Sequence, residues 1–339
     1  MSDKKNIKSI SSSSGIQNNF INRLKKVLPP TIGIAEEISD LLNISIDSAY
    51  RRIRGETDFT FEEIYIITRK HKISIDEIYG NSNDSVTFEY IKLTDSEVNF
   101  EKYLTSLRNR LESINKVEDK NIYYVAEDIP VFYSFFSKKL TEFKLFYWQK
   151  SVLNVPQYQK VNFEFGKIPK KLVEIAQESY HVFLNIPSIE IWSEGTIYTG
   201  LRQIKFYFDT GILNKIDALE LLNEYKKMIE MVQKFAEDGR KNNNNNSKNN
   251  FTLYSSEVVL GTNCIYITMG NSKYAYISFN TMNSLTTNNT EFCEETEHWV
   301  HNLERKSNLI SGVSEAQRYQ FFNTMFKSID SFIDKISHA

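Results

Sequence analysis

The sequence predicts a mainly α-helical protein, α+β overall, with a small N-terminal domain and a larger C-terminal domain. Three observations lead to this prediction. Apolar residues recur three and four positions apart in five short stretches within residues 17–80, which is typical of short amphipathic helices. Longer stretches with the same spacing follow after residue 96. Beyond residue 250 the pattern changes to β-branched and aromatic residues, which indicates a small antiparallel sheet.

The composition is that of a globular protein without extreme charge. The chain has 339 residues, of which 41% are hydrophobic, 25% charged and 13% aromatic, and its formal net charge is -2. This charge argues against a protein that coats nucleic acid or a membrane through bulk charge. No apolar run reaches the roughly 18 residues of a membrane span, residues 1–15 do not resemble a signal peptide, and the two cysteines are too few for a disulfide framework. We therefore expect a cytoplasmic protein with no membrane contact.

The chain is expected to divide into four segments. Residues 1–16 should be a disordered tail, and residues 17–80 the N-terminal helical domain. The polar residues 81–95 are expected to form a linker. Residues 96–339 make up the larger helical domain, which contains the sheet. This domain is interrupted at 241–250 by KNNNNNSKNN, a stretch that cannot bury apolar surface and should be a flexible loop.

Two helices of the N-terminal domain are joined by a short turn. Residues 34–42 carry apolar side chains on one helix face, and Asn43-Ile44-Ser45 interrupts the pattern. A second helix should begin at Ser45 and end near Gly55, since glycine readily adopts the positive φ of a helix end. Its apolar residues are Ile46, Ala49, Tyr50 and Ile53, of which Ile46, Ala49 and Ile53 are expected to face inward. Two short helices joined by a three-residue turn form a helix-turn-helix unit.

Local signals also define the other three helices of this domain. The first runs through Phe20 and Leu28 and ends at Pro29-Pro30, because the residue before a proline is pushed out of the α region. The fourth opens with the capping-box pattern Thr60-x-x-Glu63. Ser74-x-x-Glu77 has the same form and opens a fifth, shorter helix.

The outward face of the second helix in the unit is rich in arginine. With Ala49 and Ile53 turned inward, helix geometry turns Ser48 and Arg51 outward and places Asp47, Arg52 and Arg54 on the flanks. Such a helix fits the major groove of DNA, where arginine binds guanine or a phosphate. The alternative is an ordinary amphipathic helix with arginines on its solvated face. The candidate DNA-binding residues are Ser45, Asp47, Ser48, Tyr50, Arg51, Arg52 and Arg54.

These residues carry a resemblance to a known family. The strings AEEISDLLNIS, SAYRRIRGE and ISIDEIYG resemble the phage-repressor-type helix-turn-helix domains, also called Cro/C1 or XRE-like. The resemblance implies a compact, lambda-repressor-like domain of five helices. Its third helix would lie in the major groove, usually in a dimer on a palindromic operator. One departure is visible, because Arg52 stands where many members have an apolar residue and Ile53 takes the inward place.

The rest of the chain resembles a less defined group. YSSEVVLGTN, NTEFCEETEHWV and LISGVSEAQRYQFFN are similar to strings in uncharacterised bacterial helix-turn-helix regulators with a large C-terminal domain. That resemblance implies a fused C-terminal region and names no ligand.

The C-terminal domain is expected to combine long helices with a few strands. Helices are predicted from Ser96 and over 169–184, 195–208, 215–236, 290–308 and 314–336, and strands over 121–126, 251–254, 264–268 and 274–279. The first helix has a wide apolar stripe that suits a dimer or domain interface, or packing within its own subunit. The aromatic-rich segment 123–148 could form a ligand cage, or simply core.

No catalytic or cofactor motif is present. The chain lacks GxxxxGK[ST], GxGxxG after a strand, HExxH, GxSxG and paired CxxC. His298 and His301, with nearby glutamates on the same predicted helix, could hold a metal, but a solvated helix face is the simpler interpretation. We expect no enzyme activity, no cofactor and no metal.

The sequence therefore predicts a transcription regulator that binds a double-stranded DNA operator as a homodimer. The C-terminal domain would serve for dimerisation or for sensing a small-molecule or protein effector. Two alternatives stay open. The helix-turn-helix could contact another protein in an adaptor, or the C-terminal domain could be an enzyme with an unrecognised active site.

Overall fold

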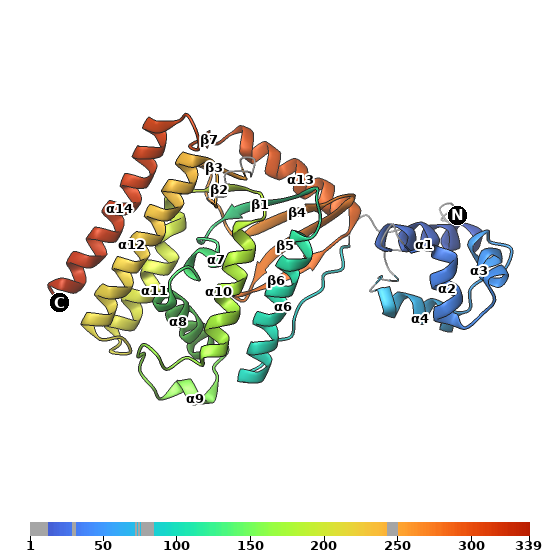
Figure 1. Cartoon of the computed structure of the whole chain (residues 1–339), viewed down its shortest axis with the longest axis horizontal. Helices are drawn as coiled ribbons and strands as arrows, with labels where there is room; N and C mark the ends of the chain where they lie inside the picture. Colours follow the sequence, from blue (N-terminus) through green and yellow to red (C-terminus); the bar gives the residue numbers. More distant parts are fainter. Residues whose placement is uncertain (1–12, 29–31, 72, 74, 76–84, 243–249) are drawn as a thin grey trace, which may run out of the picture. The chain divides into compact units, whose positions relative to one another are not determined.

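The chain forms two compact units, residues 1–87 and 88–339. The computed structural model describes residues 13–28, 32–71, 73, 75, 85–242 and 250–339 (Figure 1). Most of the predicted tail, four residues of the predicted linker, most of the Asn-rich loop and nearly all of the predicted fifth helix therefore lie outside the described residues.

The first unit is a small helical domain. Its described helices are α1 (Ser13–Val27), α2 (Ile34–Leu42), α3 (Ile46–Ile53) and α4 (Phe61–His71). The helix α1 begins before the predicted boundary at residue 17. The core of this unit is built from one or more residues of each helix and from the loop before α4, and it includes Phe20, Leu24, Ile38, Ala49, Phe59 and Ile67.

The second unit is organised around a seven-stranded mixed sheet. The strand order is β6-β5-β4-β1-β2-β3-β7. At its centre β1 (Lys120–Ala126), β2 (Ser188–Trp192) and β3 (Phe251–Ser255) run parallel. The flanking strands β4 (Cys264–Met269), β5 (Ser272–Phe279), β6 (Asn283–Thr287) and β7 (Asn308–Leu309) each pair antiparallel with their neighbours.

The prediction of a small antiparallel sheet was therefore wrong. The chain is 58% helical with a sizeable mixed sheet, and β2, β6 and β7 were missed. The strand β2 has Ser188 and Glu190 at positions facing the main core, so its sequence does not follow the usual apolar-in, polar-out alternation. The strands β6 and β7 are short and stand at the two ends of the strand order, where side chains need less burial.

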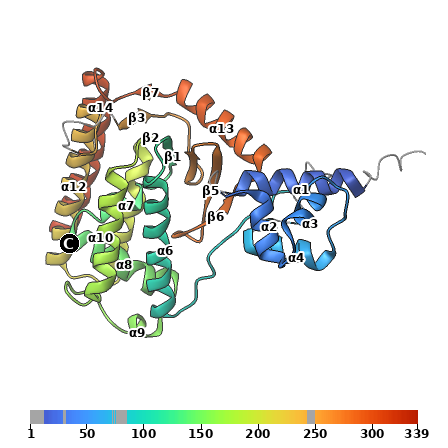
Figure 2. The same cartoon turned by 45° about the vertical axis from the view of Figure 1, so that its right-hand side comes forward.

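Two cores of different size cover the two faces of the sheet. Alternate strand residues such as Ile122, Tyr124, Leu253 and Ile267 face a large core, whereas Val125, Ile191, Tyr266 and Ala275 face a smaller one. The smaller core is closed by α13 (Thr290–Arg305). Figures 1 and 2 show α13 along one side of the sheet and the other helices gathered on the opposite side.

The helices of the larger core include most of those predicted. They are α6 (Glu97–Asn115), α7 (Val131–Ser134), α8 (Lys138–Tyr147), the π-helix η1 (Trp148–Val152), α9 (Pro156–Gln159), α10 (Lys170–Leu184), the 3-10 helix η2 (Glu194–Ile197), α11 (Tyr198–Asp209), α12 (Lys215–Asp238) and α14 (Glu315–Ser337). The helix α6 packs on α10 in the same subunit. Most aromatic side chains of segment 123–148, including Tyr133, Phe135 and Trp148, are buried in this core.

A carboxylate lies fully buried at the centre of this core. Glu190 accepts hydrogen bonds from the hydroxyls of Tyr133 (2.7 Å) and Ser188 (3.0 Å) and from Nε1 of Trp192 (3.0 Å). Burial raises the pKa of Glu190, and the charge of Lys241 together with these hydrogen bonds opposes the rise. The network thus satisfies both carboxylate oxygens in a place that water does not reach.

The nearby cation is equally buried. The Nζ atom of Lys241 donates to the carbonyl of Phe183 (3.1 Å) and lies 3.8 Å from the centroid of its ring. Burial lowers the pKa of Lys241 well below its usual value, and the charge of Glu190 opposes this effect. Each ion therefore compensates part of the desolvation of the other.

We predict that Glu190 and Lys241 are energetically coupled. Glu190→Gln leaves Lys241 without a counter-charge, so it should lower the free energy of unfolding by about 3 kcal/mol or more. In the double variant with Lys241→Met the loss should be smaller than the sum of the two single losses. Urea denaturation followed by tryptophan fluorescence measures this, since all three tryptophans lie in the second unit.

The matched control is Glu178→Gln, which changes an exposed carboxylate paired with Arg108. It should alter stability by less than about 0.5 kcal/mol. Strictly additive losses for Glu190 and Lys241 would contradict the coupling.

Candidate nucleic-acid interface

The turn between α2 and α3 is held by local hydrogen bonds. Asn43 ends α2 in the left-handed conformation, with φ 52° and ψ 49°, and the hydroxyl of Ser39 donates to the carbonyl of Ile44 (2.7 Å). Ser45 caps α3 by accepting a hydrogen bond from the backbone N–H of Ser48 (3.2 Å). The predicted turn and the predicted helix start are both confirmed, and together they fix where α3 leaves α2.

The rotation of α3 about its axis differs from the prediction. Ala49 is fully buried and is the residue at which α3 packs closely against the core, and Ile53 is partly buried beside it. Ile46, which was expected to point inward, has 40% of its surface exposed, and Tyr50, a predicted DNA-binding residue, has 44% of its surface exposed. The reason is that Arg52, rather than Ile46, shares the inward side with Ala49 and Ile53.

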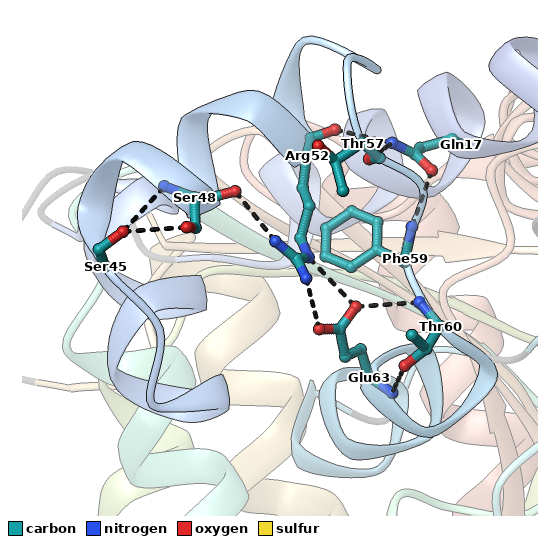
Figure 3. Close-up of polar contacts among 8 residues, drawn as sticks. All are labelled: Gln17, Ser45, Ser48, Arg52, Thr57, Phe59, Thr60 and Glu63. Carbon is teal, nitrogen blue, oxygen red and sulfur yellow. Dashed lines mark hydrogen bonds and ion pairs between the residues drawn. The ribbon is translucent and has the colours of Figure 1, made fainter.

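Arg52 is bound within the domain. Its guanidinium makes a bidentate contact with the carboxylate of Glu63, with Nη2 to Oε1 at 2.8 Å and Nε to Oε2 at 3.1 Å. Nη1 also donates to the carbonyl of Ser48 (3.3 Å). Both ionic side chains are only 16% exposed. This guanidinium therefore joins α3 to α4 (Figure 3). It is not exposed as Arg51 and Arg54 are.

Glu63 has a second role at the start of α4. Its Oε2 accepts a hydrogen bond from the backbone N–H of Thr60 (2.9 Å), and its own N–H donates to the hydroxyl of Thr60 (3.2 Å). The predicted capping box is confirmed. Burial alone would raise the pKa of Glu63, but the contacts with Arg52 and Thr60 outweigh it and lower the pKa below 4.5.

A glutamine from α1 completes this arrangement. Gln17 is buried, and its Nε2 donates to the carbonyls of Arg52 (2.8 Å) and Thr57 (2.9 Å), while its Oε1 accepts from the N–H of Phe59 (3.1 Å). The segment after α3 is thereby tied to α1, as Figure 3 shows. Sequence reasoning missed this residue, because nothing near Gln17 in the sequence signals contacts so far along the chain.

Two arginines remain on the exposed side of α3. The side chains of Arg51 and Arg54 are 61% and 55% exposed. Both lie near Glu56, whose carboxylate is 2.6 Å from Nε of Arg54 and 3.9 Å from Nε of Arg51. The hydrogen bond from Arg54 lowers the pKa of Glu56 and raises that of Arg54. Glu56 was not among the predicted site residues, although it lies directly beside them.

The seven predicted residues thus fall into two groups. Ser45, Asp47, Tyr50, Arg51 and Arg54 are exposed together on or beside α3. Arg52 is turned toward α4, and Ser48 is partly buried with its hydroxyl accepting from that of Ser45 (2.9 Å). The structure therefore offers an outward face with two cations, one aromatic ring and the acids Asp47 and Glu56.

The histidine pair on α13 offers no comparable site. Nδ1 of His301 lies 3.1 Å from Glu304, its ring packs edge-on against Tyr123, and His298 is exposed. Within the described part of the chain, no group of three or more His, Cys, Asp or Glu residues could hold a metal ion. No described helix is long and apolar enough to cross a membrane.

No family model, no curated protein and no solved structure matches the chain. The resemblance to phage-repressor-type domains stays a prediction.

We predict that Arg52 contributes to stability and Arg51 does not. Arg52→Met removes two charge-assisted hydrogen bonds from a mostly buried carboxylate, which should destabilise the first unit by about 1.5 to 3 kcal/mol. The control Arg51→Met changes an exposed side chain and should cost less than about 0.5 kcal/mol. Hydrogen exchange of the α3 and α4 amides in the full chain measures both effects. Equal protection in the two variants would show that the contact between Arg52 and Glu63 does not hold α3.

The first unit should also lose stability in acid. Because folding lowers the pKa of Glu63, its contribution is complete above pH 4.5 and is lost as the pH falls through the lowered value in the folded state. In Glu63→Gln this part of the pH dependence should be absent. Hydrogen exchange of α3 and α4, corrected for the intrinsic effect of pH on exchange, tests this between pH 3 and pH 6 (about 1.5 pH units on either side of 4.5). A wild-type profile as flat as that of the variant would contradict it.

Proposed function

We propose that this protein is a sequence-specific DNA-binding transcription regulator. The observation that carries the proposal is the outward face of α3, where Arg51 and Arg54 are exposed on a short helix that the turn at 43–45 sets against α2. Exposed arginines on the second helix of such a unit suit contacts with guanine edges and phosphates in the major groove. The resemblance to phage-repressor-type domains supports the same role.

The position of Arg52 refines this proposal. Since its guanidinium is engaged by Glu63, the contacts to DNA are assigned to Arg51 and Arg54, with Ser45, Asp47 and Tyr50 beside them. Glu56 lies near both cations and would repel a phosphate. The net charge of -2 leaves little general attraction to DNA, so affinity has to come from this local face.

The second unit is proposed to serve dimerisation and effector sensing. It spans residues 88–339 and is far larger than a linker or a short dimerisation element needs to be. A homodimer on a palindromic operator in the bacterial cytoplasm is the assembly that the family resemblance implies. The competing proposal is an adaptor in which the exposed face of α3, including Ile46 and Tyr50, contacts another protein.

We predict opposite effects for two changes on this face. Arg51→Ala should weaken operator binding by about tenfold or more, whereas Glu56→Gln should strengthen it, because it removes the acid that competes for both arginines. Operator sequences are first selected from random DNA with the purified full chain, and affinities are then measured by fluorescence anisotropy at several salt concentrations. Arg51→Ala should also make the salt dependence shallower if Arg51 contacts a phosphate.

The control is Lys170→Ala, which removes an exposed cation from α10 in the second unit and should leave affinity unchanged. If selection enriches no sequence, the regulator proposal fails and the adaptor is favoured. If DNA binds but Arg51→Ala and Arg54→Ala both leave affinity unchanged, α3 is not the helix that recognises the operator.

A further inference from the structure

A groove of about 630 Å³ lies in the second unit between α6 and the strands β4 and β5. One wall is formed by α6 residues between Glu101 and Ile114 that recur at each helical turn, and the other is formed by Met269, Tyr274 and Tyr276 of the sheet. Its volume is within the range of roughly 300 to 1,000 Å³ that is usual for small-molecule sites.

Arg110 of α6 lines this groove with a guanidinium that no described residue binds. It is partly buried, yet no described residue forms a hydrogen bond or an ion pair with its guanidinium. Arg108 on the same helix, by contrast, is paired with both Glu112 and Glu178. A partly buried guanidinium loses solvation without gaining a counter-ion, and this makes Arg110 a ready partner for an anion.

The surrounding groups strengthen this preference. The second cation lining the groove is Lys102, which lies two turns before Arg110 on α6. No carboxylate of a described residue forms an ion pair with Lys102. The carboxylate that lines it, Glu101, is held by Lys171 at 2.6 Å. The groove therefore presents two available positive charges against one acid that is already neutralised.

The sheet side supplies aromatic surface. Tyr274 and Tyr276 are two residues apart on β5, so their rings lie on the same face of the sheet, toward α6. Neither hydroxyl forms a hydrogen bond with another described residue. Burial raises the pKa of Tyr276, and the charge of Arg110 opposes that rise, which places the guanidinium close to this ring. Two rings and two free hydroxyls thus lie opposite the cations.

We propose that this groove binds a small organic anion, a carboxylate or a phosphate monoester, with a planar apolar body. The anionic group binds the guanidinium of Arg110 through paired hydrogen bonds. The apolar body packs against Tyr274, Tyr276 and Met269. Binding is independent of the proposed regulator function, whereas a role of the anion as effector rests on it.

Other cavities of the unit have a different charge pattern. A cavity of about 380 Å³ beyond the ends of β1, β2 and β3 is lined by Glu127, Glu194 and Glu257 against Arg202 alone. A cavity of about 940 Å³ beside the β5–β6 turn combines Lys92 with Asp95. Neither offers an anion the excess of positive charge that Arg110 and Lys102 provide.

The test is a titration of the full chain without DNA, by isothermal calorimetry and saturation-transfer NMR. The probes are benzoate, phenyl phosphate and the uncharged benzyl alcohol. Both anions should bind at least about tenfold more tightly than benzyl alcohol, and the stronger of the two identifies the anionic group. Arg110→Met should weaken anion binding by about tenfold or more. Arg110→Lys keeps the positive charge but lacks the planar guanidinium, so its affinity for the anions should lie between those of the wild type and of Arg110→Met.

The matched control is Arg108→Met, which removes a neighbouring arginine of α6 and should leave binding unchanged. Tryptophan fluorescence melting confirms that each variant is folded, and Tyr274→Ala provides a second test should Arg110→Met fail to fold. The proposal is overturned if neither anion binds the wild-type protein, if benzyl alcohol binds as tightly as benzoate, or if the folded Arg110 variant binds as the wild type does. Because the assay contains no DNA, a failure of operator binding leaves its result intact.

Discussion

The first unit depends on one carboxylate that serves two helices. Glu63 caps α4 through Thr60 and holds Arg52 of α3 by two hydrogen bonds. The helix α3 has eight residues and buries only Ala49 completely. So little apolar contact cannot by itself fix the rotation of a helix. The pair formed by Arg52 and Glu63, with Gln17 holding the following segment, supplies the missing constraint and decides which side chains of α3 face outward.

The parts of this unit that sequence predicts well are those governed by neighbours within about four residues. The cap at Ser45, the capping box at Thr60 and the end of α2 at Asn43 are of this kind, and the structure contains all three. Arg52 could not be assigned in the same way, because its partner lies 11 residues further along the chain. An arginine that binds a carboxylate of its own domain looks the same in a sequence as one that binds DNA. Ile46 was misplaced for the same reason, since the rotation of α3 follows from Arg52.

The second unit shows the same limit on a larger scale. Its long helices were predictable because their apolar faces repeat over many turns, and so were the strands β4 and β5, which lie over the predicted ranges 264–268 and 274–279. The parallel centre of the sheet was not. Each pairing between β1, β2 and β3 joins residues more than 60 positions apart, and β2 carries Glu190 toward the core. That glutamate is tolerated because Tyr133 of α7 and Lys241, which follows α12, converge on it together with its strand neighbours Ser188 and Trp192. No local pattern reveals the two distant partners.

The segment that follows the first unit bears on how the two proposals could be connected. Glu89 pairs with Thr286 of β6, Nδ2 of Asn283 donates to the carbonyl of Ile91 (2.6 Å), and the ring of Tyr90 packs against Phe279 at the end of β5. Residues 89–91 therefore lie beside β6 and the end of β5, shortly before the chain enters α6. The helix α6 and the strand β5, with β4, form the walls of the anion groove. An anion that moves α6 relative to β5 would act on the elements that anchor this segment. It could change operator affinity only by binding two arrangements with different free energies, and the same difference would make anion affinity depend on DNA.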